Sequence, residues 1–348
     1  HHAMTQKMIL GIICLGALAA SSCSSDDPER PASGDAISFS AVAPNGSRAA
    51  STTTASLKEF VVYGFTEGST LLDGVKVTRN GGSWTYSPEA YWPVNPINFY
   101  AFSPDITESP DIQGMDGGNI PDYTSPGNVD LLYSVKTQVT QQSAPVLLNF
   151  RHALAKVSVM LSSTNQHITV RVSNISLCNF YMQGTFNFPT SSTLASTPDV
   201  VGSWTFLKTF GKRLVFYAIG PEDRVDLTPL PTDYTENNLN YSFVIPQPLA
   251  ETEFVATKND YIGTFIQVDC EIFDTATGVK LWPNSKTPPF MLVQDTECGR
   301  IVYPTTSDEV KSWDAGHAYI YNIDINNPNV LDKIEFDVTV DDFIIDEF

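Results

Sequence analysis

A few histidines and acidic groups are the residues of this chain whose types suit catalysis or metal binding. Outside the N-terminal pair His1-His2, the histidines are His152, His167 and His317, and the acidic groups are Asp324-Ile325-Asn326 and Asp341-Asp342. Neither acidic group has the ligand number of a calcium loop. The chain has no nucleophile elbow, paired-histidine zinc motif or glycine-rich phosphate loop. We therefore expect no enzyme, no cofactor and no metal site, and a structural role for His152 inside its apolar segment.

Cys23 is the residue best placed for covalent modification. After the tag remnant His1-His2-Ala3, Lys7 precedes the apolar run Met8–Ala20, which is too short to span a bilayer and is typical of a secretion signal. The following Ser21-Ser22-Cys23 resembles the site at which bacterial lipoproteins are cleaved and acylated, although Ala20 replaces the usual Leu. We expect residues 1–23 to be tag remnant plus signal peptide, palmitate on Cys23, and outer-membrane attachment through the lipid anchor alone. An ordinary signal peptide beside an incidental cysteine is the alternative.

The other cysteines form no disulfide framework. If Cys14 leaves with the signal, then Cys178, Cys270 and Cys298 remain, an odd number without metal-ligand spacing. We expect three buried thiols, with one disulfide pair as the open alternative.

Arg48 is the candidate for proteolysis. It follows the segment Ala36–Ala43, in which Ile37, Phe39 and Ala41 alternate with other residues as in a half-buried strand. Turn residues end that strand, and a stretch rich in Ala, Ser and Thr begins at Ala49. An arginine-specific protease that cuts between Arg48 and Ala49 would therefore remove a whole strand. The alternative is an ordinary arginine in an exposed loop.

Four aromatic residues lie close together in the sequence, namely Trp84, Tyr86, Tyr91 and Trp92. Exposed aromatic rings of this kind form stacking platforms for sugars in many binding modules. The competing interpretation, which we favour, places them in the core of the first domain.

Composition indicates the elements that position these residues. The chain has 348 residues, enough for two cores, and 39 acidic against 20 basic residues give a net charge of −19. Such a charge argues against nucleic acid and against electrostatic attachment to anionic lipid. Only 17% of the residues are charged, and frequent Gly and Pro punctuate β-prone segments. We predict an all-β protein with two β-sandwich domains over residues 36–165 and 166–348, after a linker at 24–35.

The segment Val146–Leu161 separates the two halves. Its apolar positions alternate up to Leu154 and then change phase, which predicts a strand with a bulge near Ala155–Lys156. A helix is the alternative, because a second set of apolar residues fits a spacing of about 3.5 residues, namely Leu147, Phe150, Leu154, Val157 and Leu161.

The last strand shows the clearest period of two. Ile334, Phe336, Val338 and Val340 alternate with polar residues, so we predict a C-terminal extension strand over residues 333–345.

Five motifs in order carry a resemblance to a known family. They are Arg48-Ala49 after the first strand, Tyr91-Trp92-Pro93 followed by Phe99-Tyr100-Ala101-Phe102, the run Asn149–Val157, Ile245-Pro246-Gln247, and Trp313–Ile323. Together they resemble the fimbrillin-like family, the type V pilins of Bacteroidia-type bacteria, over most of the mature chain.

The resemblance implies two domains of transthyretin-like topology, lipidation at Cys23, and cleavage after Arg48 by an outer-membrane arginine-specific protease. It further implies that loss of the first strand (36–48) opens a groove, which the C-terminal strand of another pilin subunit fills. On this view the chain is a stalk or adaptor subunit of a surface fimbria, in a head-to-tail polymer. A tip adhesin with a host or bacterial receptor, or a monomeric glycan-binding lipoprotein, are the alternatives.

Overall fold

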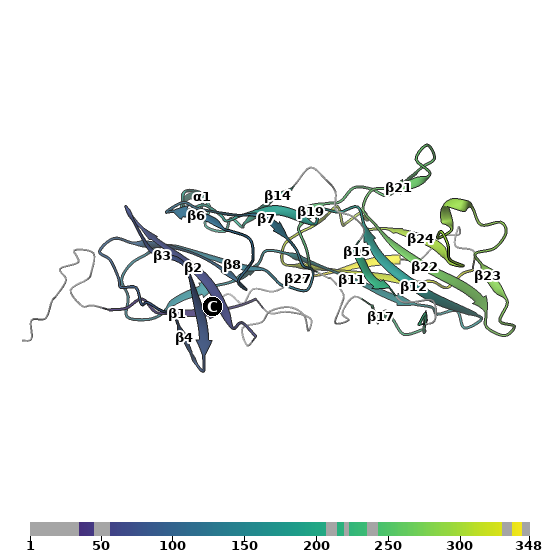
Figure 1. Ribbon diagram of the computed structural model, residues 1–348, viewed down its shortest axis with the longest axis horizontal. Helices are drawn as coiled ribbons and strands as arrows, with labels where there is room; N and C mark the ends of the chain where they lie inside the picture. Colours follow the sequence, from purple (N-terminus) through teal and green to yellow (C-terminus); the bar gives the residue numbers. More distant parts are fainter. Residues whose placement is uncertain are drawn as a thin grey trace, which may run out of the picture.

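The structure is a computed structural model that describes residues 35–44, 56–206, 214–218, 223–234, 243–328 and 336–342. Its regular structure is almost entirely strand, so the predicted all-β class is confirmed; the described helices are α1 (Ser191–Ser196) and the 3₁₀ turn η1 (Pro289–Met291). Neither is long and apolar enough to cross a membrane. Figure 1 shows an elongated molecule in which two β-lobes follow one another along the long axis.

The first lobe is built on a six-stranded sheet. In spatial order its strands are β10 (Arg151–His152), β8 (Leu132–Val139), β5 (Ile97–Ser103), β2 (Glu59–Thr66), β3 (Ser69–Asn80) and β4 (Ser83–Thr85). Strand β5 is buried along its whole length. Its residues alternate between two cores, since Phe99 packs in one cluster and Tyr100 in another. Burial on both faces explains why this strand is mostly apolar rather than alternating; its polar residues Asn98 and Ser103 are buried as well.

One layer covers each face of this sheet (Figure 1). The lower layer in the view pairs β1 (Phe39–Val42) with β9 (Val146–Asn149). The upper layer has the order β14 (Ser203–Phe206), β13 (Gln183–Asn187), β7 (Gly117–Thr124) and β6 (Asp111–Gly114). The first lobe is therefore a three-layered structure.

The second lobe has two facing sheets around one core. The first contains β17 (Thr232–Asp233), β11 (Ala155–Ser162), β26 (His317–Asp324) and β27 (Phe336–Asp342), with β18 (Phe243–Val244) on β11. The second contains β15 (Leu214–Ala218), β12 (Ile168–Cys178), β22 (Phe265–Asp274) and β23 (Lys280–Trp282), with β16 (Val225–Asp226) and β24 (Gly299–Pro304). Two short strand pairs complete the second lobe. They are β19 (Gln247–Pro248) with β25 (Ser312–Trp313), and β20 (Glu253–Val255) with β21 (Asp260–Ile262).

The three cysteines of the described chain lie in this second lobe. Cys178, Cys270 and Cys298 are buried and free, as expected, so no disulfide joins them. Burial raises the pKa of the Cys270 thiol well above its usual range, so this thiol stays protonated.

The segment Val146–Leu161 is extended, so the helical alternative is wrong. The change of phase has a different cause from the predicted bulge, because the chain bends at Ala153–Leu154 between β10 and β11. Up to the bend the residues pack in the two cores of the first lobe, and from Ala155 onward they pack in the core of the second.

This bend also corrects the expected domain limits at residue 165. Strand β11 lies before that limit but belongs to the second core. Strands β13 and β14 lie after it but pair with β7 on the first lobe. The chain therefore passes between the lobes more than once, which a single boundary cannot describe.

A buried pair of side chains in hydrogen-bond contact, His152 and Asp130, lies at the junction of the lobes. The Nδ1 atom of His152 is 2.8 Å from Oδ1 of Asp130, and the two side chains are 2% and 1% exposed. Close by in sequence, Lys156 is fully buried, with its Nζ 5.6 Å from the centroid of the Phe243 ring. The predicted structural role of His152 agrees with this geometry.

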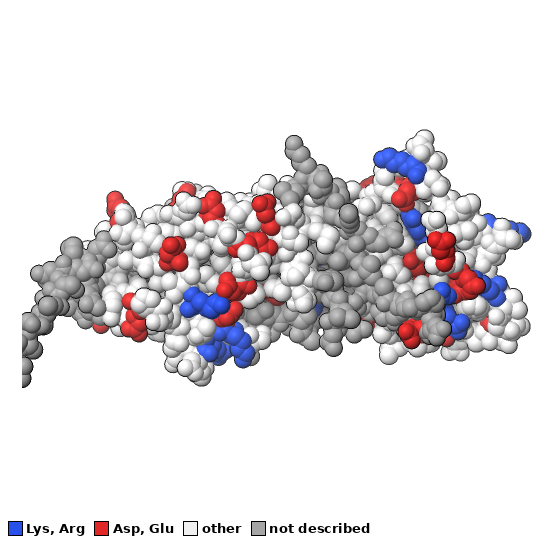
Figure 2. Space-filling model, viewed as in Figure 1, with Lys and Arg blue, Asp and Glu red and all other residues white. Residues whose placement is uncertain are grey.

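Charge on the surface is dispersed. Figure 2 shows acidic side chains spread over both lobes of the visible face, with lysines and arginines in smaller groups between them. A net charge of −19 distributed in this way favours solubility rather than attraction of one charged ligand.

Removal of one member of the junction pair should destabilise the fold strongly. Asp130→Ala takes from the buried His152 side chain its hydrogen-bond contact with the carboxylate, at an expected cost of about 1–3 kcal/mol in the free energy of unfolding. Urea unfolding measures this cost, and Asp199→Ala at an exposed position is the matched control. An equal effect of both substitutions would contradict the structural role of the pair.

Candidate functional site

The first strand, β1, lies in a slot between two neighbouring segments. On one side it pairs in parallel with β9, and Val146 N donates to Ser38 O at 2.8 Å. On the other side Ile37 N donates to Ala90 O at 2.8 Å, and Trp92 N donates to Asp35 O at 3.2 Å. The strand is thus held on both sides by backbone hydrogen bonds, which any extended segment could form.

The side chains that point inward from β1 complete the core of the first lobe. Ile37, Phe39 and Ala41 are 1%, 3% and 8% exposed, whereas Ser40 and Val42 are only partly buried. The predicted half-buried strand is therefore confirmed. We call residues 35–44 the plug, and the space between β9 and the 90–92 segment the slot.

Phe39 occupies an aromatic socket formed by Phe60, Tyr86 and Phe99. Its ring meets theirs edge to face, at centroid distances of 5.9, 5.5 and 5.6 Å. Each such pair contributes about 0.5–1.5 kcal/mol beyond area burial. The socket is thus the most specific part of the slot.

Tyr86 also holds the main chain of the plug. Its hydroxyl donates to the carbonyl oxygen of Ile37, and the Ala90 N–H donates to the same hydroxyl at 3.2 Å. Burial raises the pKa of Tyr86, which keeps the phenol protonated and able to donate. Sequence reasoning had placed Tyr86 in a sugar platform or the core, but no local pattern indicated a contact with the first strand.

The geometry of this aromatic group favours the core over the sugar platform. Trp92 is only 1% exposed and belongs to the same core as the plug. Trp84 is half-buried over Phe60, with a centroid distance of 5.2 Å. Trp92 therefore lies in the core of the first lobe, and Trp84 and Tyr86 pack against that core while partly exposed.

The predicted C-terminal strand is present as β27, at the end of the sheet order in the second lobe. It pairs antiparallel with β26, where Phe336, Val338 and Val340 stand opposite Ile323, Tyr321 and Tyr319. In the described part of this sheet β27 has one neighbouring strand, β26. An edge strand with one neighbour has fewer backbone hydrogen bonds to lose than an internal strand.

The plug and β27 lie in different lobes, and no ladder pairs them within the described residues. Of the other predicted site residues, Cys23, Arg48, Ala49 and Ile334 lie outside the described residues. Arg48 belongs to the connection between Pro44 and Ser56, which joins the plug to the rest of the lobe.

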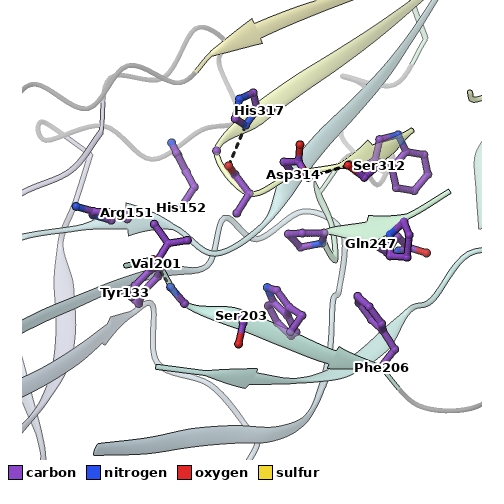
Figure 3. A pocket seen from close by; sticks show the side chains of 17 residues that line it. Tyr133, Arg151, His152, Val201, Ser203, Phe206, Gln247, Ser312, Asp314 and His317 are labelled. Carbon is purple, nitrogen blue, oxygen red and sulfur yellow. Dashed lines mark hydrogen bonds between the residues drawn. The ribbon is translucent and has the colours of Figure 1, made fainter. Parts of the chain in front are cut away.

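A cavity of about 810 Å³ opens where the two lobes meet. Figure 3 shows Tyr133, Val201, Ser203 and Phe206 on one side and Asp314 and His317 on the other. The polar contacts within its walls include Ser312 Oγ to Asp314 Oδ1 at 2.9 Å and His317 Nδ1 to Ala315 O at 3.0 Å. Between distant segments, the Gly202 N–H donates to Tyr133 Oη at 2.9 Å. Sequence reasoning missed this cavity, because its lining comes from several distant segments.

The described residues also contain no group of three or more His, Cys, Asp or Glu side chains that could hold a metal ion. The chemistry that the arrangement supports best is therefore binding of an extended strand in the slot.

Comparison with known proteins gives a consistent result. The sequence profile described as fimbrillin-like matches residues 32–342. No curated protein matches the chain. The fold is similar to that of a fimbrial protein from Bacteroides vulgatus, with 12% identity and a TM-score of 0.53 over 88% of this chain and 99% of the other. It is also similar to a Bacteroides eggerthii protein assigned to cell adhesion, with 11% identity and a TM-score of 0.50 over 89% and 97%.

Truncation of the plug's aromatic side chain should destabilise the first lobe. Phe39→Ala empties the socket of Phe60, Tyr86 and Phe99, at an expected cost of about 3–5 kcal/mol. Ser40→Ala, one residue along the same strand, is the control and should cost little. Chemical denaturation of both variants measures the difference; equal stabilities would show that the socket does not hold the plug.

Proposed function

This chain belongs to the fimbrillin-like family, and we propose that it is a stalk or adaptor subunit of a surface fimbria, activated by removal of its plug and polymerised by strand donation. Proteins of this family serve in general as fimbrial subunits at the cell surface. The proposal adds how one copy becomes competent to bind the next.

One observation carries the proposal: the plug completes a core although it joins the rest of its lobe through a connection that contains Arg48. Inside the slot, Ile37 and Phe39 are almost fully buried. After a cut between Arg48 and Ala49, the plug is held only by non-covalent contacts and can leave.

Export would bring the chain to the membrane where the protease acts. We propose that the chain reaches the outer membrane as a lipoprotein with palmitate on Cys23, and that an arginine-specific protease there cuts after Arg48. Because the lipid is on the fragment that the cut releases, cleavage also frees the remaining chain from its anchor.

An empty slot would favour binding of another strand. Loss of the plug leaves β9 without its partner and exposes apolar residues such as Leu148 and Phe150, a state that proteins avoid. The C-terminal strand of another subunit offers Ile334, Phe336, Val338 and Val340. Their burial is worth about 6–12 kcal/mol in total before the costs of ordering.

Such an exchange produces a filament. The slot lies in the first lobe and the donor strand in the second, so the two contact surfaces of one subunit are different. A head-to-tail contact of this kind does not close unless its rotation happens to form a ring. Since this chain has both surfaces, it can sit inside a stalk.

Arginine-specific proteolysis tests the proposal. Treatment of the chain without its lipid should give a core that begins at Ala49 by intact mass and that forms oligomers by size-exclusion chromatography. Arg48→Gln should remain monomeric under the same conditions. Arg30→Gln, which removes the other arginine near the N-terminus, should assemble like the unchanged chain.

Two outcomes would contradict it. The first is a core cut after Arg48 that stays a stable monomer at every concentration tested. The second is polymerisation of Arg48→Gln at the same rate as the unchanged chain.

A further inference from the structure

The C-terminal strand repeats the residue order of the plug. At alternate positions the plug reads Asp35, Ile37, Phe39, Ala41 and Ala43. With the same spacing and in the same direction, the C-terminal strand reads Asp332, Ile334, Phe336, Val338 and Val340. Three of the five positions are identical, and the other two differ only in the size of an apolar side chain.

The matching positions are those whose side chains lie at the entrance of the slot or inside it. Asp35 is exposed at the entrance, and the next four are buried: Ile37 at 1%, Phe39 at 3%, Ala41 at 8% and Ala43 at 6%. The shared phenylalanine coincides with the aromatic socket, where the plug makes its most specific contacts. A generic amphipathic strand would have no reason to carry its aromatic residue at this position.

On the basis of the proposed function, we infer that the C-terminal strand of a second copy enters the slot in the same direction as the plug. Its register places Phe336 in the socket of Phe39. Ile334 then takes the position of Ile37, and Val338 and Val340 take those of Ala41 and Ala43. The partner is thus a second copy of this chain, or a subunit with the same pattern.

The opposite direction is disfavoured by charge. If the strand ran the other way with Phe336 still in the socket, Ile334 would replace Ala41 and Asp332 would replace Ala43. The side chain of Ala43 is only 6% exposed, and an unpaired carboxylate is costly to bury there.

Shifted registers are disfavoured by size. A shift by two residues in either sense removes the phenylalanine from the socket and places Val338 or Ile334 there. It also places Phe336 where the slot holds Ile37 or Ala41. Well-packed cores tolerate neither an empty aromatic site nor a large side chain in a small one.

The main-chain contacts of the slot can serve both strands. The Ala90 carbonyl accepts from the Ile37 N–H, while Tyr86 Oη and the Trp92 N–H donate to the carbonyls of Ile37 and Asp35. All of these contacts involve the backbone of the plug, so a different sequence in the same register can form them. The side-chain sites then set the register, and the backbone contacts hold the strand.

The differences between the two strands favour replacement of the plug by the donor strand over the reverse exchange. Val338 and Val340 carry two more methyl groups each at the sites of Ala41 and Ala43, which are the least buried inward positions of the plug. The donor therefore covers more apolar surface than the plug that it replaces.

Cysteine cross-linking between copies tests the register. In the plug Val42 stands opposite Asn149 of β9, and Ser40 stands opposite Leu147. In the inferred register Thr339 replaces Val42 and Asp337 replaces Ser40. After cleavage and mild oxidation, chains carrying Asn149→Cys and chains carrying Thr339→Cys should give a disulfide-linked dimer on a non-reducing gel, whereas Asn149→Cys with Asp337→Cys should not.

A second pair makes the test independent of one position. Leu147→Cys should link to Asp337→Cys and fail to link to Thr339→Cys. Leu147 is only partly buried and Asn149 is exposed, so both cysteines spare the core. The native Cys178, Cys270 and Cys298 are buried and compete little.

The outcomes separate this inference from the proposed function. If oligomers form but Asn149→Cys links to Asp337→Cys instead of Thr339→Cys, the inferred register is wrong and strand donation is not contradicted. Mixed oligomers with no cross-link from either pair would lead to the same conclusion. Failure of the cut, unmodified chains to associate would overturn strand donation, and the register with it.

Discussion

The first lobe cannot close its core without a strand in the slot. Its central sheet packs apolar residues on both faces, and on one face the plug lies in the covering layer between β9 and the 90–92 segment. Phe39 fills a socket of three aromatic rings that no other described side chain of the plug could fill. A ten-residue segment therefore decides whether the lobe is complete, and the proposed assembly rests on this dependence.

The last strand of the second lobe lies at the end of one sheet. Its core lies between two sheets, and β27 adds to the edge of one of them beside β26. The bend at Ala153–Leu154 carries the chain from one core to the next, with the buried Asp130–His152 pair beside it. The last strand and the slot thus lie on separate lobes, as the proposed contact between copies requires.

Periodicity in the sequence predicted the elements that have one buried face. The alternation of Ile37, Phe39 and Ala41 and that of the last strand each correspond to a strand in the structure. The domain limits could not be predicted in this way, because a change of phase looks the same for a bulge and for a passage between cores. The junction cavity had no sequence signal at all, and Cys23 and Arg48 remain predictions.

The fate of the released plug tests the central claim most directly. After cleavage, the monomer and polymer fractions from size-exclusion chromatography can be analysed by mass spectrometry for the fragment that ends at Arg48. The account predicts that the fragment stays with cut monomers and is absent from polymers, because one slot holds one strand. Polymers that retain one fragment per subunit would contradict it.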